Sequence, residues 1–167
     1  RPVSAPRPGP VATAARGLKV EDGVLWAMTD RGLLASVGAD GAVRFETFAL
    51  PDARSGLSAN HVAALSVDGR GRVWAGMFDG GIDVLDADSG ERLERLTDGD
   101  VREVNAFCAE QGTGRMWVAS SRGLVAFDEG RKSKTVGADQ GLAGSSATAV
   151  TAGVGPTGTG VAVATSS

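Results

Sequence analysis

The side chains best suited to chemistry in this sequence favour binding over catalysis. His61 is the only histidine and Cys108 the only cysteine among the 167 residues. Zinc sites built from several histidines or from Cys-x-x-Cys pairs are therefore impossible, and no other metal or cofactor motif is found. The sequence also lacks a Walker phosphate loop and the Gly-x-Ser-x-Gly turn of serine hydrolases. We predict that the chain is not an enzyme, holds no metal and takes no cofactor.

Candidate binding residues are those that a meander of four short strands would bring to one face. In such a meander, the turn between the second and third strands lies at the same end as the connection to the next first strand. Loops on a rigid scaffold are where ligands usually bind, and Phe78 is an apolar residue stranded at such a turn. The alternative is that these loop residues are ordinary solvent-exposed turn residues with no role in binding. The predicted binding residues of this face are Arg31, Asn60, His61, Phe78, Asp79, Arg102 and Arg122.

The elements that must position these residues recur along the chain. The segment 71–76 (GRVWAG) returns at 114–119 (GRMWVA), with a looser copy at 23–28 and a degenerate one at 160–165. With Trp26, Trp74, Trp117 and Val163 taken as equivalent, the spacings are 48, 43 and 46 residues. A period in the forties with strand-like apolar runs is typical of a β-propeller blade. We predict that the three tryptophans are structural and pack between neighbouring blades.

The second repeat shows the expected strands most clearly. Strands are predicted over 61–67, 72–77, 82–86 and 92–96, with glycine-containing turns between them. The first two strands are apolar on both faces, as expected for inner strands sandwiched between two blades. The last strand is charged, as expected at a solvent-facing edge. Cys108 falls in an inner strand of the third repeat and is predicted to be a buried small hydrophobe.

The predicted fold class is all-β: a propeller of four-stranded antiparallel blades, about three and a half of them, in an incomplete ring. The blades span about 17–50, 56–98, 101–136 and a truncated 141–167, after a Pro-rich lead-in or linker at 1–16. A ring usually needs at least four blades. We therefore expect either a piece of a longer propeller or completion by another copy or another chain, with self-association through the open blade edges.

One segment carries a competing signal. Residues 100–103 have the pattern of a helix N-cap with a capping box, and Val101, Val104 and Phe107 then fall on one helical face. The alignment of this segment with the strand at 61–67 favours a strand instead.

Charge and hydropathy limit the partners. The net charge is −3, with 17 basic and 20 acidic residues interspersed, and the lack of a basic patch argues against nucleic acid. No apolar run approaches the roughly 18 residues that span a membrane. Any membrane attachment is expected only through other parts of a parent chain.

The segments 56–62 (GLSANHV), 68–76 (DGRGRVWAG) and 80–82 (GGI) together resemble the two-component regulator propeller repeat. In that family, an opening GL-S-N-x-V motif precedes D-x-x-G-x-I/V-W-V/I-G-T and a G-I/L strand. The resemblance covers about 17–167 and is strongest over 56–86, while the first and third units lack the opening motif. It implies a non-catalytic ligand-sensing or recognition propeller of a bacterial signalling protein, on the extracytoplasmic (periplasmic) side.

Two other functions stay open at this stage. A propeller lyase or hydrolase related to virginiamycin B lyase would use His61 with a partner from blades outside this sequence. A scaffold propeller would instead bind other proteins, as WD-repeat proteins do. The expected ligand of the sensor is an unknown small molecule or glycan, or a protein.

Overall fold

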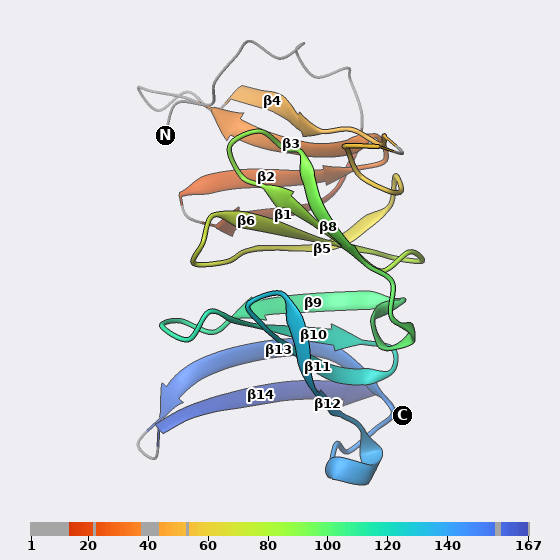
Figure 1. Ribbon diagram of the computed structural model, residues 1–167, viewed down its shortest axis with the longest axis vertical. Helices are drawn as coiled ribbons and strands as arrows, with labels where there is room; N and C mark the ends of the chain where they lie inside the picture. The colour runs from red at the N-terminus through yellow and green to blue at the C-terminus, as the bar shows by residue number, and fades with distance from the viewer. Residues whose placement is uncertain (1–13, 22, 38–43, 53, 156–157, 167) are drawn as a thin grey trace.

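The computed structural model describes residues 14–21, 23–37, 44–52, 54–155 and 158–166. They form fourteen strands and two single-turn 3-10 helices (Figure 1). The elements are β1 (Ala15–Glu21), β2 (Val24–Thr29), β3 (Gly32–Val37), β4 (Arg44–Ala49), β5 (Val62–Val67), β6 (Arg72–Met77), β7 (Ile82–Asp86), β8 (Arg92–Leu96), η1 (Gly99–Val101), β9 (Val104–Ala109), β10 (Arg115–Ser120), β11 (Gly123–Asp128), β12 (Arg131–Val136), η2 (Ala138–Gln140), β13 (Ser146–Gly155) and β14 (Gly158–Ser166).

The strands form three four-stranded antiparallel meanders followed by a two-stranded hairpin. Sheet 1 is β1 to β4, sheet 2 is β5 to β8, sheet 3 is β9 to β12, and sheet 4 is β13 and β14. Neighbouring sheets meet mainly through their first strands, and the four sheets stack in chain order with sheets 1 and 4 at opposite ends (Figure 1). The predicted all-β fold with an incomplete ring is therefore confirmed.

The predicted lead-in lies mostly outside the described residues, because 1–13 are not described and β1 already begins at Ala15.

The helical alternative for 101–108 is wrong. A single 3-10 turn, η1, ends at Val101, and the strand β9 follows from Val104. Here β9 pairs Ala106 with Ala119 and Val104 with Ser120, so Asn105 is an extra residue that forms a β-bulge. The bulge places Val104 and Phe107 on the same side although they are three residues apart, and that spacing imitates a helix.

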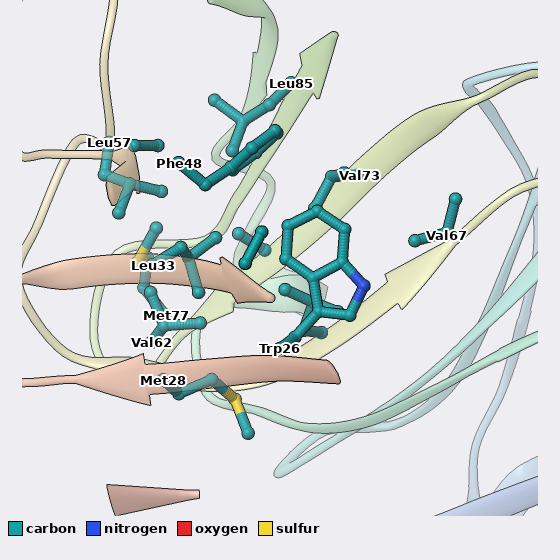
Figure 2. Close-up of a cluster of buried hydrophobic side chains, with 14 residues drawn as sticks. Trp26, Met28, Leu33, Phe48, Leu57, Val62, Val67, Val73, Met77 and Leu85 are labelled. Atoms are coloured by element: carbon teal, nitrogen blue, oxygen red, sulfur yellow. The ribbon is translucent and has the colours of Figure 1, made fainter. Parts of the chain in front are cut away.

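Each joint between two sheets has its own apolar core, and each core contains one tryptophan. Trp26, Trp74 and Trp117 are 4%, 1% and 7% exposed and lie in the clusters between sheets 1 and 2, 2 and 3, and 3 and 4. Figure 2 shows the Trp26 indole directed from β2 toward Val73 of sheet 2. Every indole thus points forward, into the next sheet along the chain.

Taking Val163 as the fourth equivalent of these tryptophans is wrong by one residue. Trp117 pairs across the sheet with Cys108, and the corresponding pair in sheet 4 is Ala162 with Thr151. Val163 points the other way, back against the core shared with sheet 3. The longer β13–β14 hairpin shifts the side-chain alternation relative to the other sheets, and a one-residue shift in a strand exchanges its two faces.

The loop between sheets 1 and 2 is anchored on sheet 2. Asp83 is fully buried in β7, and its Oδ2 accepts a hydrogen bond from the Ser58 amide at 2.6 Å. The Arg92 amide and guanidinium donate to the Ser55 and Gly56 carbonyls at 2.6 and 2.9 Å. These contacts hold the segment that delivers His61 to the start of β5.

Candidate functional site

Two kinds of loop meet at one end of the sheets, on the right in Figure 1. They are the turns between second and third strands and the loops that precede the first strands. The Phe78 amide donates to the His61 carbonyl at 3.1 Å, and the Gly80 amide donates to the Arg102 carbonyl at 3.3 Å. In sheet 3 the Ser121 amide makes the same kind of bond to the Glu103 carbonyl at 3.1 Å. The turns between second and third strands are thus tied to the loops that precede the first strands, as the meander argument predicts.

A β-bulge recurs near this end of every first strand. The extra residues are Arg16 in β1, Ala63 in β5, Asn105 in β9 and Thr148 in β13. All four are exposed. A bulge re-aims a side chain that regular alternation would place elsewhere. Each sheet therefore exposes one additional side chain, that of its bulged residue, near this end of its first strand.

A groove of about 390 Å³ opens between sheets 1 and 2 at this end. Its lining includes two of the bulged residues, Arg16 and Ala63, together with His61 and the 66%-exposed Phe78. Met28 forms part of its floor. Gly17 makes room for this side chain, because a Cβ at Gly17 would lie 2.6 Å from Met28 Cε. An exposed ring beside cationic and apolar groups can hold a ligand with both an apolar face and polar edges.

The structure brings some of the predicted residues together and keeps others apart. His61 and Phe78 share the groove, and beside it Arg102 forms an exposed ion pair with Asp79 at 3.7 Å. Arg31 and Arg122 sit on equivalent turns of sheets 1 and 3, with their amides bonded to the Thr29 and Ser120 hydroxyls.

Asn60, Arg31 and Arg122 are exposed, but they are not among the described residues that line the groove. Arg16 and Met28 are lining residues that sequence reasoning missed. They lie 62 and 50 positions before Phe78 in the chain, and only the bulge in β1 aims Arg16 at this groove. The one usable signal was Gly17, a glycine inside an apolar strand pattern.

A second cavity, of about 780 Å³, lies at the opposite end of the first strands. The turns between first and second strands of sheets 2 and 3 line it, together with Lys19 and Val150. Its charged groups are paired: Lys19 contacts Glu21 at 2.7 Å, and Arg70 contacts Glu129. Cys108, predicted to be buried, is only half-buried here, and its Sγ accepts a hydrogen bond from the Ala152 amide at 3.1 Å.

The acidic groups beside this cavity hold the tryptophans. Asp68 Oδ2 accepts hydrogen bonds from Trp74 Nε1 at 3.0 Å and Arg72 Nε at 2.7 Å. Glu110 repeats this in sheet 3, with Trp117 Nε1 at 3.1 Å. Trp26 Nε1 is buried and has no such partner among the described residues.

The hydrogen bonds to Asp68 also set its protonation. Burial alone would raise the pKa of this carboxyl group. The hydrogen bonds from the Trp74 indole, the amides of Arg72 and Arg70 and the Arg72 side chain outweigh that effect, so the pKa lies below its ordinary value. Asp68 is therefore charged near neutral pH, and its role is structural.

Among the described residues, no three His, Cys, Asp or Glu side chains are grouped closely enough to hold a metal ion. In the same part of the chain, neither helix has the length and apolar character that crossing a bilayer requires.

No protein-family description matches the sequence, and no curated protein matches it either. Solved structures do match. The extracellular domain of the hybrid two-component system BT3049 from B. thetaiotaomicron aligns with 81% of this chain at 20% identity and a TM-score of 0.64. The chain spans only 18% of the length of that solved domain.

Two further matches come from other contexts. The WD40 repeats of RRP9 align with 85% of the chain at 18% identity and a TM-score of 0.64, and the chain spans 43% of them. The computationally designed Ika4 protein aligns with 92% of the chain at 17% identity and a TM-score of 0.60, over 93% of its own length. The chain has a β-propeller fold. The resemblance to two-component regulator propellers thus agrees with the fold of solved sensor domains, and the WD40 match shows the same fold in a repeat protein.

Proposed function

We propose that this chain is the recognition part of an extracytoplasmic signalling propeller and that it binds a glycan in the groove between sheets 1 and 2. The observation that carries the proposal is the exposed Phe78 ring on the wall of that groove. The sensor domain of B. thetaiotaomicron, which shares the fold, supports the signalling context. The expected event is binding without turnover.

The chemistry of the groove suits a sugar. The C–H face of a sugar ring is apolar and packs on an aromatic side chain, while its hydroxyl groups need donors and acceptors at the edges. Phe78 supplies the ring, and Arg16 and His61 supply polar groups in the lining of the same groove. A volume of about 390 Å³ is near the lower end for ligand pockets, so it fits a short segment of a glycan rather than a whole chain.

The backbone holds Phe78 in place before any ligand arrives. Its amide is bonded to the His61 carbonyl, and the turn that carries it is fixed to the next sheet through Gly80 and Arg102. A ligand therefore meets a turn whose backbone is already held in place, and binding does not have to order that loop. Such preorganisation lowers the entropic cost of association.

The experiment is a screen of the 167-residue chain on a glycan array, followed by titration calorimetry with the glycans retained. Phe78→Ala should weaken binding at least about tenfold, equivalent to about 1.4 kcal/mol. Arg16→Ala should weaken binding as well. Leu93→Ala and Arg122→Ala are matched controls, since Leu93 is an exposed leucine on β8 and Arg122 an arginine outside the groove. Both should bind like the unmodified chain.

Two results would contradict the proposal. One is that no glycan on the array is retained. The other is that Phe78→Ala binds a retained glycan as tightly as the unmodified chain. Catalytic turnover of a retained glycan would favour the lyase or hydrolase alternative instead.

A further inference from the structure

The outer faces of sheets 1 and 4 lie at the two ends of the stack (Figure 1). The corresponding faces of the sheets inside the stack are covered by a neighbouring sheet. On sheet 1, Leu18 and Val20 of β1 point away from sheet 2 and are 61% and 69% exposed. The alternate residue Lys19 points inward, and its Nζ donates to the Leu65 carbonyl at 2.7 Å. On sheet 4, the residues that point away from sheet 3 are Ala149, Thr151, Ala162 and Ala164, all exposed.

The bulges put the four first strands into one register and so identify the equivalent positions. Counting from each bulge, Leu18 corresponds to Leu65 and Phe107, which are 2% and 5% exposed. Val20 corresponds to Val67, which is 8% exposed. At internal joints these positions are buried against the preceding sheet. Among the described residues no sheet covers them on sheet 1, which therefore carries an uncovered docking surface of the same kind.

The outward face of sheet 4 is the other half of such a joint. Thr151 and Ala162 occupy the positions that Cys108 and Trp117 hold in sheet 3, where they face the next sheet. None of the four outward side chains is charged or bulky. The backbone of a neighbouring sheet can therefore approach closely, and Leu18 and Val20 would meet small apolar and hydroxyl groups.

One copy cannot join its own two faces, because sheets 1 and 4 lie at opposite ends of the stack (Figure 1). A second copy offers both complementary faces at once. Two copies contain eight sheets, four from each, and rings of four to eight blades are the usual range for propellers. The missing joint would thus continue the sheet-on-sheet stacking that already occurs three times within the chain.

We propose that two copies of this chain associate head to tail, with the Leu18–Val20 face of each copy seated on the outward face of the other copy's β13–β14 hairpin. The two joints are identical and heterologous, and a two-fold axis through the centre of the ring closes the assembly. This inference depends on the fold and is independent of the glycan proposal.

The first test measures mass by light scattering after size-exclusion chromatography. The chain is expected at twice its 16.9 kDa mass. Leu18→Lys/Val20→Lys places two charges in each joint and should give a monomer with an unchanged circular dichroism spectrum. The matched control Leu93→Lys alters a 57%-exposed leucine on β8 and should stay dimeric. A folded monomer for the unmodified chain, or open polymers in place of a dimer, would overturn the proposal.

The second test asks which faces meet. At the joint between sheets 3 and 4, Cys108 Sγ lies 3.1 Å from the Ala152 amide. The corresponding positions across the proposed joint are Thr151 of one copy and Val20 of the other. In a Cys108→Ser background, a mixture of Val20→Cys and Thr151→Cys chains should form a disulfide-linked pair, and neither variant alone should do so. Crosslinking of either variant with itself would show like faces meeting and would overturn head-to-tail closure.

Discussion

At the scale of single residues, the three tryptophans share a position but not a hydrogen bond. Trp74 and Trp117 donate to Asp68 and Glu110, while Trp26 Nε1 is buried without a partner among the described residues. The turn before Trp26 is shorter, and Val24 stands where Arg72 precedes Trp74. In this chain, an indole that donates a hydrogen bond to an acidic side chain therefore has a sequence signature. The acidic residue stands six or seven positions before the tryptophan, and an arginine stands two positions before the tryptophan.

This difference predicts unequal costs for the same substitution. Trp74→Phe should destabilise the fold by about 1–3 kcal/mol more than Trp26→Phe, because it removes a donor from a buried carboxylate. Both changes lose similar ring volume in a joint core, so packing largely cancels in the comparison. Urea unfolding of the two variants measures the difference. Equal losses would mean that the Asp68 bond contributes little.

The lowered pKa of Asp68 predicts a pH dependence of stability. A carboxyl group whose folded pKa is depressed stabilises the protein above its unfolded pKa of about 3.9, and that contribution is lost as pH falls through the folded pKa. Asp68→Asn should therefore be less stable at neutral pH and should lose less stability on acidification below about pH 4. Other acids remain in both proteins, so the difference between two urea series isolates Asp68. Parallel curves would contradict the assignment.

At the scale of elements, the joint between sheets 2 and 3 depends on a small residue. A Cβ at Gly76 of β6 would lie 2.5 Å from Val104 Cγ1 and 2.9 Å from Phe107 Cε2. Gly76→Ala should cost about 1–3 kcal/mol, because the two sheets must move apart or repack. Gly153→Ala is the control, since that strand glycine has open space where its Cβ would be. Thermal unfolding of both variants compares them, and similar midpoints would refute this account of the joint.

Much of the element order follows from the sequence, because glycine turns and doubly apolar strands are local signals. The bulges do not follow from it. In β9 the extra residue Asn105 gives Val104 and Phe107 a spacing that suits a helix equally well, and only pairing with β10 decides. The alignment of Val163 with the tryptophans was wrong for a related reason. The length of the hairpin determines which face of the sheet a residue occupies, and the sequence motif alone does not reveal that length.

The candidate site was predictable in part. Phe78 and His61 could be found because an apolar residue at a turn and a lone histidine stand out locally, and because meander topology brings their loops together. Arg16 and Met28 could not, since their place in the groove depends on a bulge and on packing between sheets. The hydrogen-bonding of the indoles was also missed, because Asp68 resembles an ordinary turn residue.

At the scale of the whole molecule, the groove around Phe78 lies at one end of the first strands, and the larger cavity beside Asp68 and Glu110 lies at the other end. Size alone would favour the larger cavity. Its charges are already paired within the protein, while the smaller groove presents an exposed aromatic ring. For this reason we propose the smaller groove, and not the larger cavity, as the recognition site.

Hydrogen–deuterium exchange tests this assignment most directly. The chain is compared with and without a glycan retained on the array. Binding in the groove should slow exchange at residues 61–63 and 77–80, which border it, and leave exchange at 68–70 and 111–114 unchanged. Protection confined to 68–70 and 111–114 would place the ligand in the opposite cavity and contradict binding beside Phe78.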